Sequence, residues 1–399
     1  MNGLVLSGGG GKGAYQIGVW KALRKIHYKI DIVTGTSVGC LNALLITQNY
    51  KFLAPFIWSR IDFSEIFQDD VKKEQTTMEI IEMYGKNILK NKGMSTDNLQ
   101  KKLDKVVNYR RFYKSKVDFG LVTVNLSDLK PVVLTKKEIP KERLKDYLMA
   151  SATCYPAFKM KDIDGNKYID GGYYDVLPIN LAVKMGATKI VAVDLKSFGI
   201  KKKVKDKNIP VTYIVPRNNI GYSLLFNRNV NKLNMKYGYN DTLKDFGRLE
   251  GNKFTFKKNF TKHINHQLVK NNILCFYNLK NIEKNILLNK KLKHFISDTL
   301  DTKAYIKILE NIGYSYNLPD YNIYSIRKFN KLVTNKINKQ EPIKKLGINP
   351  SKKDVITFLY SCMLNNETNK IKKISLIYSN EFIAAIYLYT ITRGKYHAI

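Results

Sequence analysis

Ser37 occupies a spacing that could make its hydroxyl a nucleophile, because one glycine stands two residues before it and another two residues after it. The segment consists of Gly35, Thr36, Ser37, Val38 and Gly39. It joins a predicted strand, Ile30–Thr34, to a predicted helix, Val38–Thr47, which is the context of a nucleophile elbow. On such a turn the hydroxyl projects above the sheet, and the following helix points free N–H groups toward it. The alternative is a glycine-rich turn in which Ser37 only caps the helix.

A second candidate segment opens the chain, after the predicted strand Leu4–Ser7 and before the predicted helix Ala14–Ile26. Its residues are Gly8, Gly9, Gly10, Gly11, Lys12 and Gly13. Main-chain N–H groups of glycine can approach a bound group closely, because no side chain intervenes. That group could be a nucleotide phosphate or the oxygen of a reacting carbonyl.

The nucleotide interpretations fit this segment poorly. A phosphate-binding Walker loop needs Ser or Thr after its lysine, whereas Lys12 is followed by Gly13. A dinucleotide fingerprint fits Gly8-x-Gly10-x-x-Gly13, but the available acid, Asp31, precedes the second strand instead of following it. Loops that leave adjacent parallel strands share one crevice, so the glycines can face Ser37 and hold a carbonyl oxygen. A nucleotide-dependent enzyme remains the third-ranked alternative.

A nucleophilic serine needs a base, and the histidines are poorly placed to supply one. His27 falls at the far end of the first predicted helix, and the others lie in the basic second half; these are His263, His266, His294 and His397. The best candidate is Asp170, which ends a predicted hairpin strand and is followed by Gly171 and Gly172. The alternative role for Asp170 is a turn residue. Nearby acids fit less well: Asp162 and Asp164 flank the hairpin turn, and Asp175 is predicted to be a local cap.

The elements that must position these residues alternate between strands and helices over about the first two hundred residues. The further predicted strands are Phe119–Val124, Pro131–Thr135, Phe158–Ile163, Lys167–Ile169, Lys189–Leu195 and Val211–Val215. A charged helical region is predicted over 57–107, and a short helix from Pro140 through Tyr147. This order predicts an α/β fold of three layers, α/β/α, with a mostly parallel central sheet. From about Lys257 the chain becomes rich in Lys and Asn and helical in pattern, so we predict domains at residues 1–260 and 261–399, the second smaller and mainly helical.

Composition limits the class of protein. The 399 residues, 44% of them hydrophobic, can bury a large core. The four cysteines are scattered and form no Cys-x-x-Cys pair, which argues against a disulfide framework or a zinc site. The first strand begins near Met1, so we expect no signal peptide and a cytoplasmic protein. The formal charge of +35 comes mostly from residues 201–399. That half could meet anionic lipid or nucleic acid, or its lysines could simply cover a solvated surface.

Three of these segments, in their order along the chain, resemble the signatures of patatin-like phospholipases. They are Gly8 to Gly13, Gly35 to Gly39 and Asp170-Gly171-Gly172; the segment Ala150 to Phe158, with its Ala-Ser and Pro, is also similar to that family. The resemblance covers about residues 1–250 and implies the patatin-like fold. It also implies a Ser–Asp dyad in place of a triad, with Ser37 as the nucleophile and Asp170 as the proton acceptor.

The same resemblance implies an oxyanion hole of main-chain N–H groups from the Gly9–Gly11 region and an acyl-enzyme intermediate. Lys12 would add positive potential near this loop, or would simply be solvated. A desolvated site would raise the pKa of Asp170 and make it a better base. The chemistry requires no metal and no cofactor.

The sequence therefore predicts a lipid acyl hydrolase of the phospholipase A or lysophospholipase type. It would cleave carboxylic esters at a membrane surface, with the basic C-terminal region meeting anionic lipid and no nucleic acid as partner. The alternative is a catalytically silent basic protein that binds lipid or nucleic acid. Labelling by a fluorophosphonate serine probe distinguishes the two.

Overall fold

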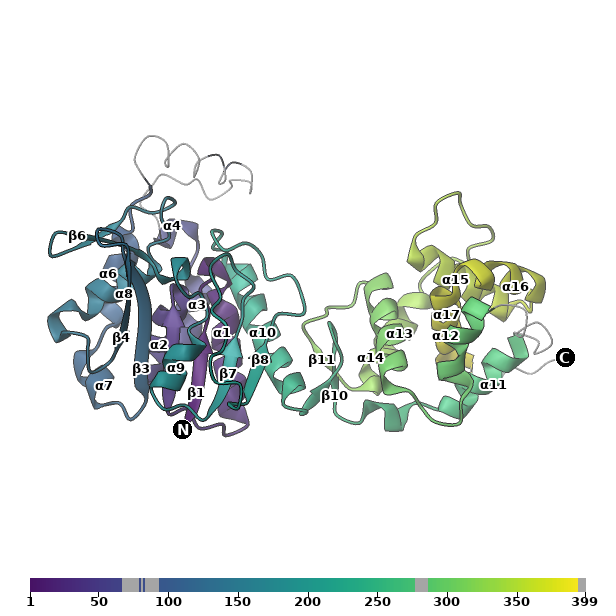
Figure 1. Ribbon diagram of the computed structural model, residues 1–399. Coiled ribbons are helices and arrows are strands. Elements are labelled where there is room, and N and C mark those ends of the chain that lie inside the picture. Colours follow the sequence, from purple (N-terminus) through teal and green to yellow (C-terminus); the bar gives the residue numbers. More distant parts are fainter. Residues whose placement is uncertain (67–78, 80–81, 83–92, 277–285, 394–399) are drawn as a thin grey trace. The chain divides into compact units, whose positions relative to one another are not determined.

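The computed structural model describes residues 1–66, 79, 82, 93–276 and 286–393, which form two compact units, Met1–Asp245 and Phe246–Ile399 (Figure 1). The sequence analysis placed the domain boundary after residue 260, whereas the division by contacts falls at the end of a long helix, between Asp245 and Phe246. Part of the helical region predicted over 57–107, and His397, lie outside the described residues.

Unit 1 is built around an eight-stranded sheet with the order β5-β6-β3-β2-β1-β7-β8, in which β4 also pairs with β3. The strands are β1 (Asn2–Leu6), β2 (Ile32–Thr36), β3 (Asp118–Asn125), β4 (Lys130–Thr135), β5 (Lys161–Ile163), β6 (Asn166–Asp170), β7 (Lys189–Val193) and β8 (Val211–Ile214). Five neighbouring strands, β3, β2, β1, β7 and β8, run parallel. Strands β4 and β6 each pair antiparallel with β3, and β5 pairs antiparallel with β6. The prediction of a mostly parallel sheet is confirmed.

Helices flank this sheet. They are α1 (Ala14–Lys25), α2 (Val38–Thr47), α3 (Leu53–Arg60), α4 (Phe63–Ile66), α6 (Asp97–Val106), α7 (Tyr109–Lys114), α8 (Leu144–Ala152), α9 (Ile179–Lys184) and α10 (Arg228–Asp245). Val5, Ile32 and Ile190 point from one face of the sheet into a buried cluster with residues of α9. On another side α2 packs against β1, β2 and β3, and α1 packs against α2.

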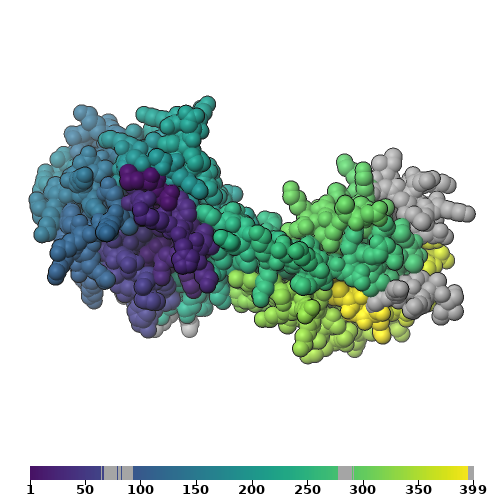
Figure 2. Space-filling view, turned by 90° about the horizontal axis from the view of Figure 1, so that it is seen from below, coloured from purple at the N-terminus to yellow at the C-terminus, as the bar shows by residue number. Residues whose placement is uncertain are grey.

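The backbones of α1 and α10 are in direct contact. A methyl group added to Gly18 would lie 2.1 Å from the carbonyl oxygen of Met235, and one added to Gly238 would lie 2.0 Å from that of Tyr15. The Tyr15 hydroxyl also donates to Asp241, at 2.9 Å. In Figure 2 the purple N-terminal residues accordingly lie between blue residues from the middle of the unit and green residues near α10.

Unit 2 is mainly helical, as predicted, with α11 (His266–Phe276), α12 (Ile286–Ile296), α13 (Thr302–Ser315), α14 (Ile326–Ile337), α15 (Lys352–Leu364), α16 (Thr368–Ile377) and α17 (Ser379–Arg393). It also contains a small sheet that the sequence analysis did not predict, formed by β9 (Leu249–Glu250), β10 (Thr255–Lys257) and β11 (Ile323–Tyr324).

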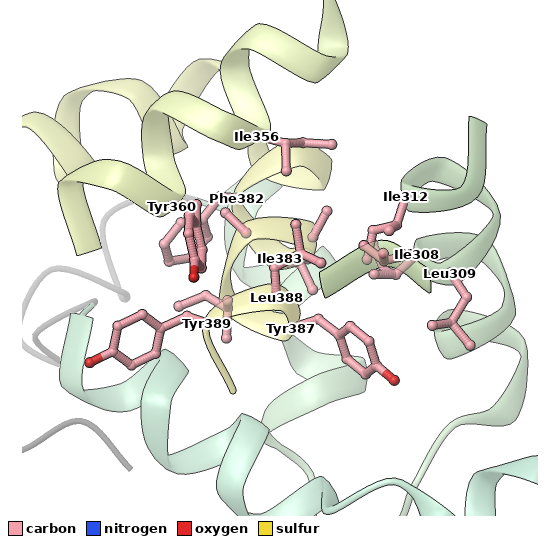
Figure 3. Packing of buried hydrophobic residues seen from close by; sticks show 14 of the residues in the cluster. Ile308, Leu309, Ile312, Ile356, Tyr360, Phe382, Ile383, Tyr387, Leu388 and Tyr389 are labelled. Atoms are coloured by element: carbon pink, nitrogen blue, oxygen red, sulfur yellow. The ribbon is translucent and has the colours of Figure 1, made fainter. Parts of the chain in front are cut away.

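The apolar stretch Phe382–Ile391 belongs to α17, which supplies much of the core of unit 2. Phe382, Ile383 and Leu388 pack there with residues of α13 and α15 (Figure 3). Among the helices that the structure describes, this one included, none has the length and hydrophobicity needed to cross a membrane.

Candidate active site

A cavity of about 410 Å³ in unit 1 contains both predicted catalytic residues. Ser37 follows β2, and Gly8, Gly9 and Gly10 follow β1, at the carboxyl ends of two adjacent parallel strands. Asp170 ends β6, which is antiparallel to β3 and pairs with the carboxyl-terminal part of that strand. The remaining walls are largely apolar and include Leu41, Leu45, Ile57, Ile61, Leu99, Leu103, Phe158, Val176 and Phe226. Such a lining suits a hydrocarbon chain.

Ser37 stands on a strained turn between β2 and α2. Its φ of 58° lies in the left-handed region, which side chains other than glycine rarely adopt and which is typical of functional turns. The flanking glycines are required by close approach, because a methyl group on Gly35 would lie 2.4 Å from the backbone of Gly39. Val38 lines the cavity, and the Thr36 hydroxyl donates to the carbonyl of Asp175, at 2.8 Å.

Ser151 holds this turn in place. The sequence analysis included it in the segment Ala150 to Phe158, which is similar to the patatin-like family, but assigned it no role. The Ser37 N–H donates to Ser151 Oγ at 3.0 Å, and that hydroxyl donates to the carbonyl of Val122 at 2.7 Å. Ser151 lies near the end of α8, which runs to Ala152 instead of ending at Tyr147 as predicted. The serine N–H is therefore already bonded.

Asp170 is buried, with only 5% of its surface exposed. Burial raises the pKa of Asp170 to about 6, against the opposing effect of hydrogen-bonding interactions with the Ser37 side chain and the Gly172 N–H. The Gly172 N–H lies 2.7 Å from Asp170 Oδ1. Gly172 also lines the cavity, whereas Gly171 packs against the backbone of Val122. The structure thus brings Ser37 and Asp170 together, with the carboxyl in surroundings that favour taking up a proton.

The glycine-rich segment divides into bonded and free N–H groups. The N–H of Gly8 donates to Val176 at 3.0 Å, that of Gly11 to Ser223 at 2.7 Å, and that of Lys12 to Gly9 at 3.1 Å. Among the described residues, no acceptor is within hydrogen-bonding range of the N–H groups of Gly9 and Gly10. Gly11, Lys12 and Gly13 do not line the cavity. Partial burial lowers the pKa of Lys12.

Ser197 is a polar residue of the cavity that the sequence analysis missed. Its Oγ is buried and has no hydrogen-bond partner among the described residues. A methyl group added to Gly9 would lie 2.8 Å from this oxygen, so the hydroxyl is adjacent to a free main-chain N–H. No motif marks Ser197, because it follows β7 in a segment with no pattern of its own.

The other titratable candidates lie elsewhere or have structural roles. Asp175 accepts from the Leu177 N–H at 3.3 Å, as predicted for a local cap, and burial raises its pKa to about 6. Of the histidines that the structure describes, none lines the cavity. His266 packs in unit 2, where its ring nitrogens lie within hydrogen-bonding distance of Tyr305 and Ser297. Within the described part of the chain, no three His, Cys, Asp or Glu residues cluster as a metal site would require.

Comparison with known proteins identifies the domain that carries the candidate catalytic residues. Residues 4–183 match the sequence profile of the patatin-like phospholipases. These residues form a patatin-like phospholipase domain. The profile spans Ser37, Asp170 and the whole glycine-rich segment, whereas the lining residues Ser197 and Ser223 lie beyond its end.

Curated relatives of the patatin-like domain carry related names. Lysophospholipase nte1 of Aspergillus terreus is 27% identical over 216 residues, which are 53% of this chain and 12% of that protein. Probable lipid hydrolase 463L of Invertebrate iridescent virus 6 is 25% identical over 189 residues, which are 45% of this chain and 63% of that protein. The chain therefore matches about an eighth of the first relative and less than two thirds of the second. The solved structure of VipD from Legionella pneumophila aligns with 98% of this chain and 90% of its own, at 15% identity and a TM-score of 0.38.

Proposed function

We propose that this protein hydrolyses the carboxylic esters of lipids through a Ser37–Asp170 dyad. One observation carries the proposal: a serine on a strained turn interacts with a buried carboxyl of raised pKa inside a largely apolar cavity. A lipid ester needs these features, since its acyl chain seeks an apolar wall while its carbonyl meets the nucleophile.

In the first half of the reaction, Ser37 Oγ forms a bond to the ester carbonyl carbon, and the hydroxyl proton passes to the Asp170 carboxylate. The negative charge develops on the former carbonyl oxygen. Collapse of this intermediate breaks the ester C–O bond, and the leaving alcohol takes the proton from Asp170. In the second half, water attacks the acyl-enzyme, Asp170 accepts its proton, and the fatty acid leaves as Ser37 recovers its hydrogen.

The oxyanion would be bound by the N–H groups of Gly9 and Gly10, which have no acceptor among the residues that the structure describes. This refines the broader prediction of Gly9–Gly11, because the Gly11 N–H already donates to Ser223. The buried hydroxyl of Ser197 supplies a third donor beside them. Donors that are fixed before the reaction stabilise developing charge without reorganising, and this is often the largest single contribution to catalysis.

A fluorophosphonate probe tests the proposal directly. We expect it to label the full chain on Ser37, as located by peptide mass spectrometry, and we expect the Ser37→Ala variant to remain unlabelled. Ser375→Ala is the matched control, because Ser375 is a buried serine of unit 2 whose hydroxyl donates to the carbonyl of Lys372. A protein that binds lipid vesicles but neither reacts with the probe nor releases fatty acid would instead support the silent basic lipid-binding protein.

A further inference from the structure

Solvent-exposed aromatic side chains lie in or directly beside segments that line the cavity. Phe198 lines the cavity although 93% of its surface is exposed, so its ring must stand at the opening. Tyr173 also lines the cavity and is 38% exposed. Tyr222, which directly precedes the lining residue Ser223, is 68% exposed. Single exposed apolar residues are common, but several around one opening indicate an interaction surface.

Main-chain hydrogen bonds anchor the turn that carries Phe198. Two residues after it, the Ile200 N–H donates to the carbonyl of Gly172 at 2.9 Å, and the Ile200 carbonyl accepts from Val176 at 2.7 Å. The side chain of Ile200 is itself 52% exposed. The turn is therefore attached to the segment that directly follows Asp170, and it carries two exposed apolar side chains, Phe198 and Ile200.

The same turn is positively charged. Lys196, Lys201 and Lys202 are exposed, and the acid next to them, Asp194, pairs with Lys201 at 2.6 Å. The Lys202 ammonium lies 4.1 Å from the centre of the Tyr174 ring, which leaves its charge at the surface. Exposed aromatic and aliphatic side chains beside lysines have the chemistry of a contact with the headgroup region of an anionic bilayer.

We propose that this rim, consisting of Tyr173, Lys196, Phe198, Ile200, Lys201, Lys202 and Tyr222, docks the protein on an anionic lipid surface. The inference rests on the proposed function, because a lipid would then pass from the bilayer into the cavity without crossing water. It places the membrane contact in unit 1, whereas the sequence analysis expected it in the basic C-terminal region.

Tryptophan fluorescence tests whether the rim touches lipid. Both native tryptophans, Trp20 and Trp58, are buried, so a Phe198→Trp variant adds one exposed reporter. In a Ser37→Ala background, which prevents hydrolysis, we expect phosphatidylcholine vesicles containing phosphatidylserine to shift its emission to the blue and brominated lipids to quench it. Ile348→Trp is the matched control, at a fully exposed apolar residue of unit 2. A shift at 348 without one at 198 would overturn the proposal in favour of the C-terminal region.

Vesicle co-sedimentation gives the energetic test. We expect Phe198→Ser to weaken partitioning about tenfold, because burial of a phenylalanine side chain is lost. We expect Lys196→Gln combined with Lys202→Gln to weaken binding to the anionic vesicles about tenfold, with little effect on vesicles of phosphatidylcholine alone. Unchanged partitioning of both variants, with circular dichroism spectra like that of the parent, would refute docking through the rim. Loss of probe labelling at Ser37 would refute the proposed function instead, so the two failures are distinguishable.

Discussion

The two units bury polar groups in different ways. In unit 1, burial raises the pKa of the Asp170 and Asp175 carboxyls to about 6. Asp170 faces a largely apolar cavity, where the Ser197 hydroxyl and the N–H groups of Gly9 and Gly10 have no partner in the part of the chain that the structure describes. In unit 2, large aromatic side chains fill the core, and the buried Tyr387 hydroxyl bonds to Asn330 at 2.9 Å. The Thr255 hydroxyl and one Glu250 oxygen of unit 2 are also buried without a partner among the described residues, but they line no cavity with the catalytic candidates. Unit 1 thus gathers groups that are costly to bury around one cavity, whereas the core of unit 2 is built mainly from apolar and aromatic side chains. Net charge, which is highest in the second half, does not indicate where the candidate site lies.

The largest expected effect is on catalysis by unit 1. We expect Ser37→Ala and Asp170→Asn each to lower kcat for ester hydrolysis by at least about 10³-fold, because the nucleophile or its base is lost. Release of fatty acid from lysophospholipid and from a p-nitrophenyl ester measures this, with Ser375→Ala as the control. Full activity in either variant would show that the Ser37–Asp170 pair of unit 1 is not the catalytic dyad.

A core truncation in unit 2 should change stability and leave chemistry intact. Phe329 is fully buried, with ring centroids of Phe256 and Tyr324 at 5.4 and 5.5 Å. We expect Phe329→Ala to lower the free energy of unfolding of unit 2 by about 3–5 kcal/mol. Urea titration followed by circular dichroism measures the loss. A fall in kcat under conditions where the variant remains folded would show that unit 2 contributes to catalysis and not only to stability.

The raised pKa of Asp170 predicts opposite effects of pH on stability and activity. The folded protein holds the Asp170 proton up to a pH of about 6, whereas the unfolded chain loses it near its ordinary value of 3.8, so rising pH through this window favours the unfolded state. The loss amounts to up to about 3 kcal/mol. We expect Asp170→Asn to be more stable than the parent by that amount at neutral pH and equally stable near pH 4.

Ionisation of the same carboxyl, which lowers stability, should raise the activity. Because the base must be ionised, kcat/KM of the parent protein should rise as pH increases through about 6 and then level off. Urea unfolding of the parent and of Asp170→Asn, near pH 4 and at neutral pH, measures the effect on stability. The pH profile of kcat/KM of the parent measures the effect on activity. Equal stabilities at neutral pH would contradict a carboxylate that destabilises the fold.

The smallest expected effect concerns the third oxyanion donor. We expect Ser197→Ala to lower kcat by about tenfold to 10²-fold with little change in KM, since the hydroxyl would act only as charge develops. Ser197→Thr keeps a hydroxyl and should retain more of the rate. Steady-state kinetics on a soluble ester measures both variants, and an unchanged kcat in Ser197→Ala would limit the oxyanion donors to the glycine N–H groups.

Local sequence patterns were sufficient to predict the elements nearest the cavity. The helix Val38–Thr47 has the predicted bounds, and the strand before it, β2, is shifted by only two residues. Both were predictable because a run of apolar residues, a glycine turn and the start of a helix follow one another without interruption. The small sheet of unit 2 was not predictable in this way, since β9 and β11 have two residues each and pair with a strand only through tertiary structure.

The candidate site was predictable only where a motif marked it. Ser37, Asp170 and the glycine-rich segment stand in recognisable spacings, and the structure brings Ser37, Asp170 and the first three glycines of that segment into one cavity. Ser151 bonds to the backbone of Ser37 across 114 residues of sequence, and Ser197 comes next to Gly9 only because β7 pairs with β1. Contacts of this kind depend on the packed sheet, so no single segment of sequence indicates them.

The backbone contact between α1 and α10 will shape the outcome of any large-scale mutagenesis of this domain. Every substitution at Gly18 or Gly238 forces two helices apart, so a screen scored by hydrolysis alone will rank these glycines beside Ser37 although neither lines the cavity. Scoring protein abundance in the same library would separate the two classes, because a Ser37 variant accumulates as folded, inactive protein and a Gly18 variant does not accumulate.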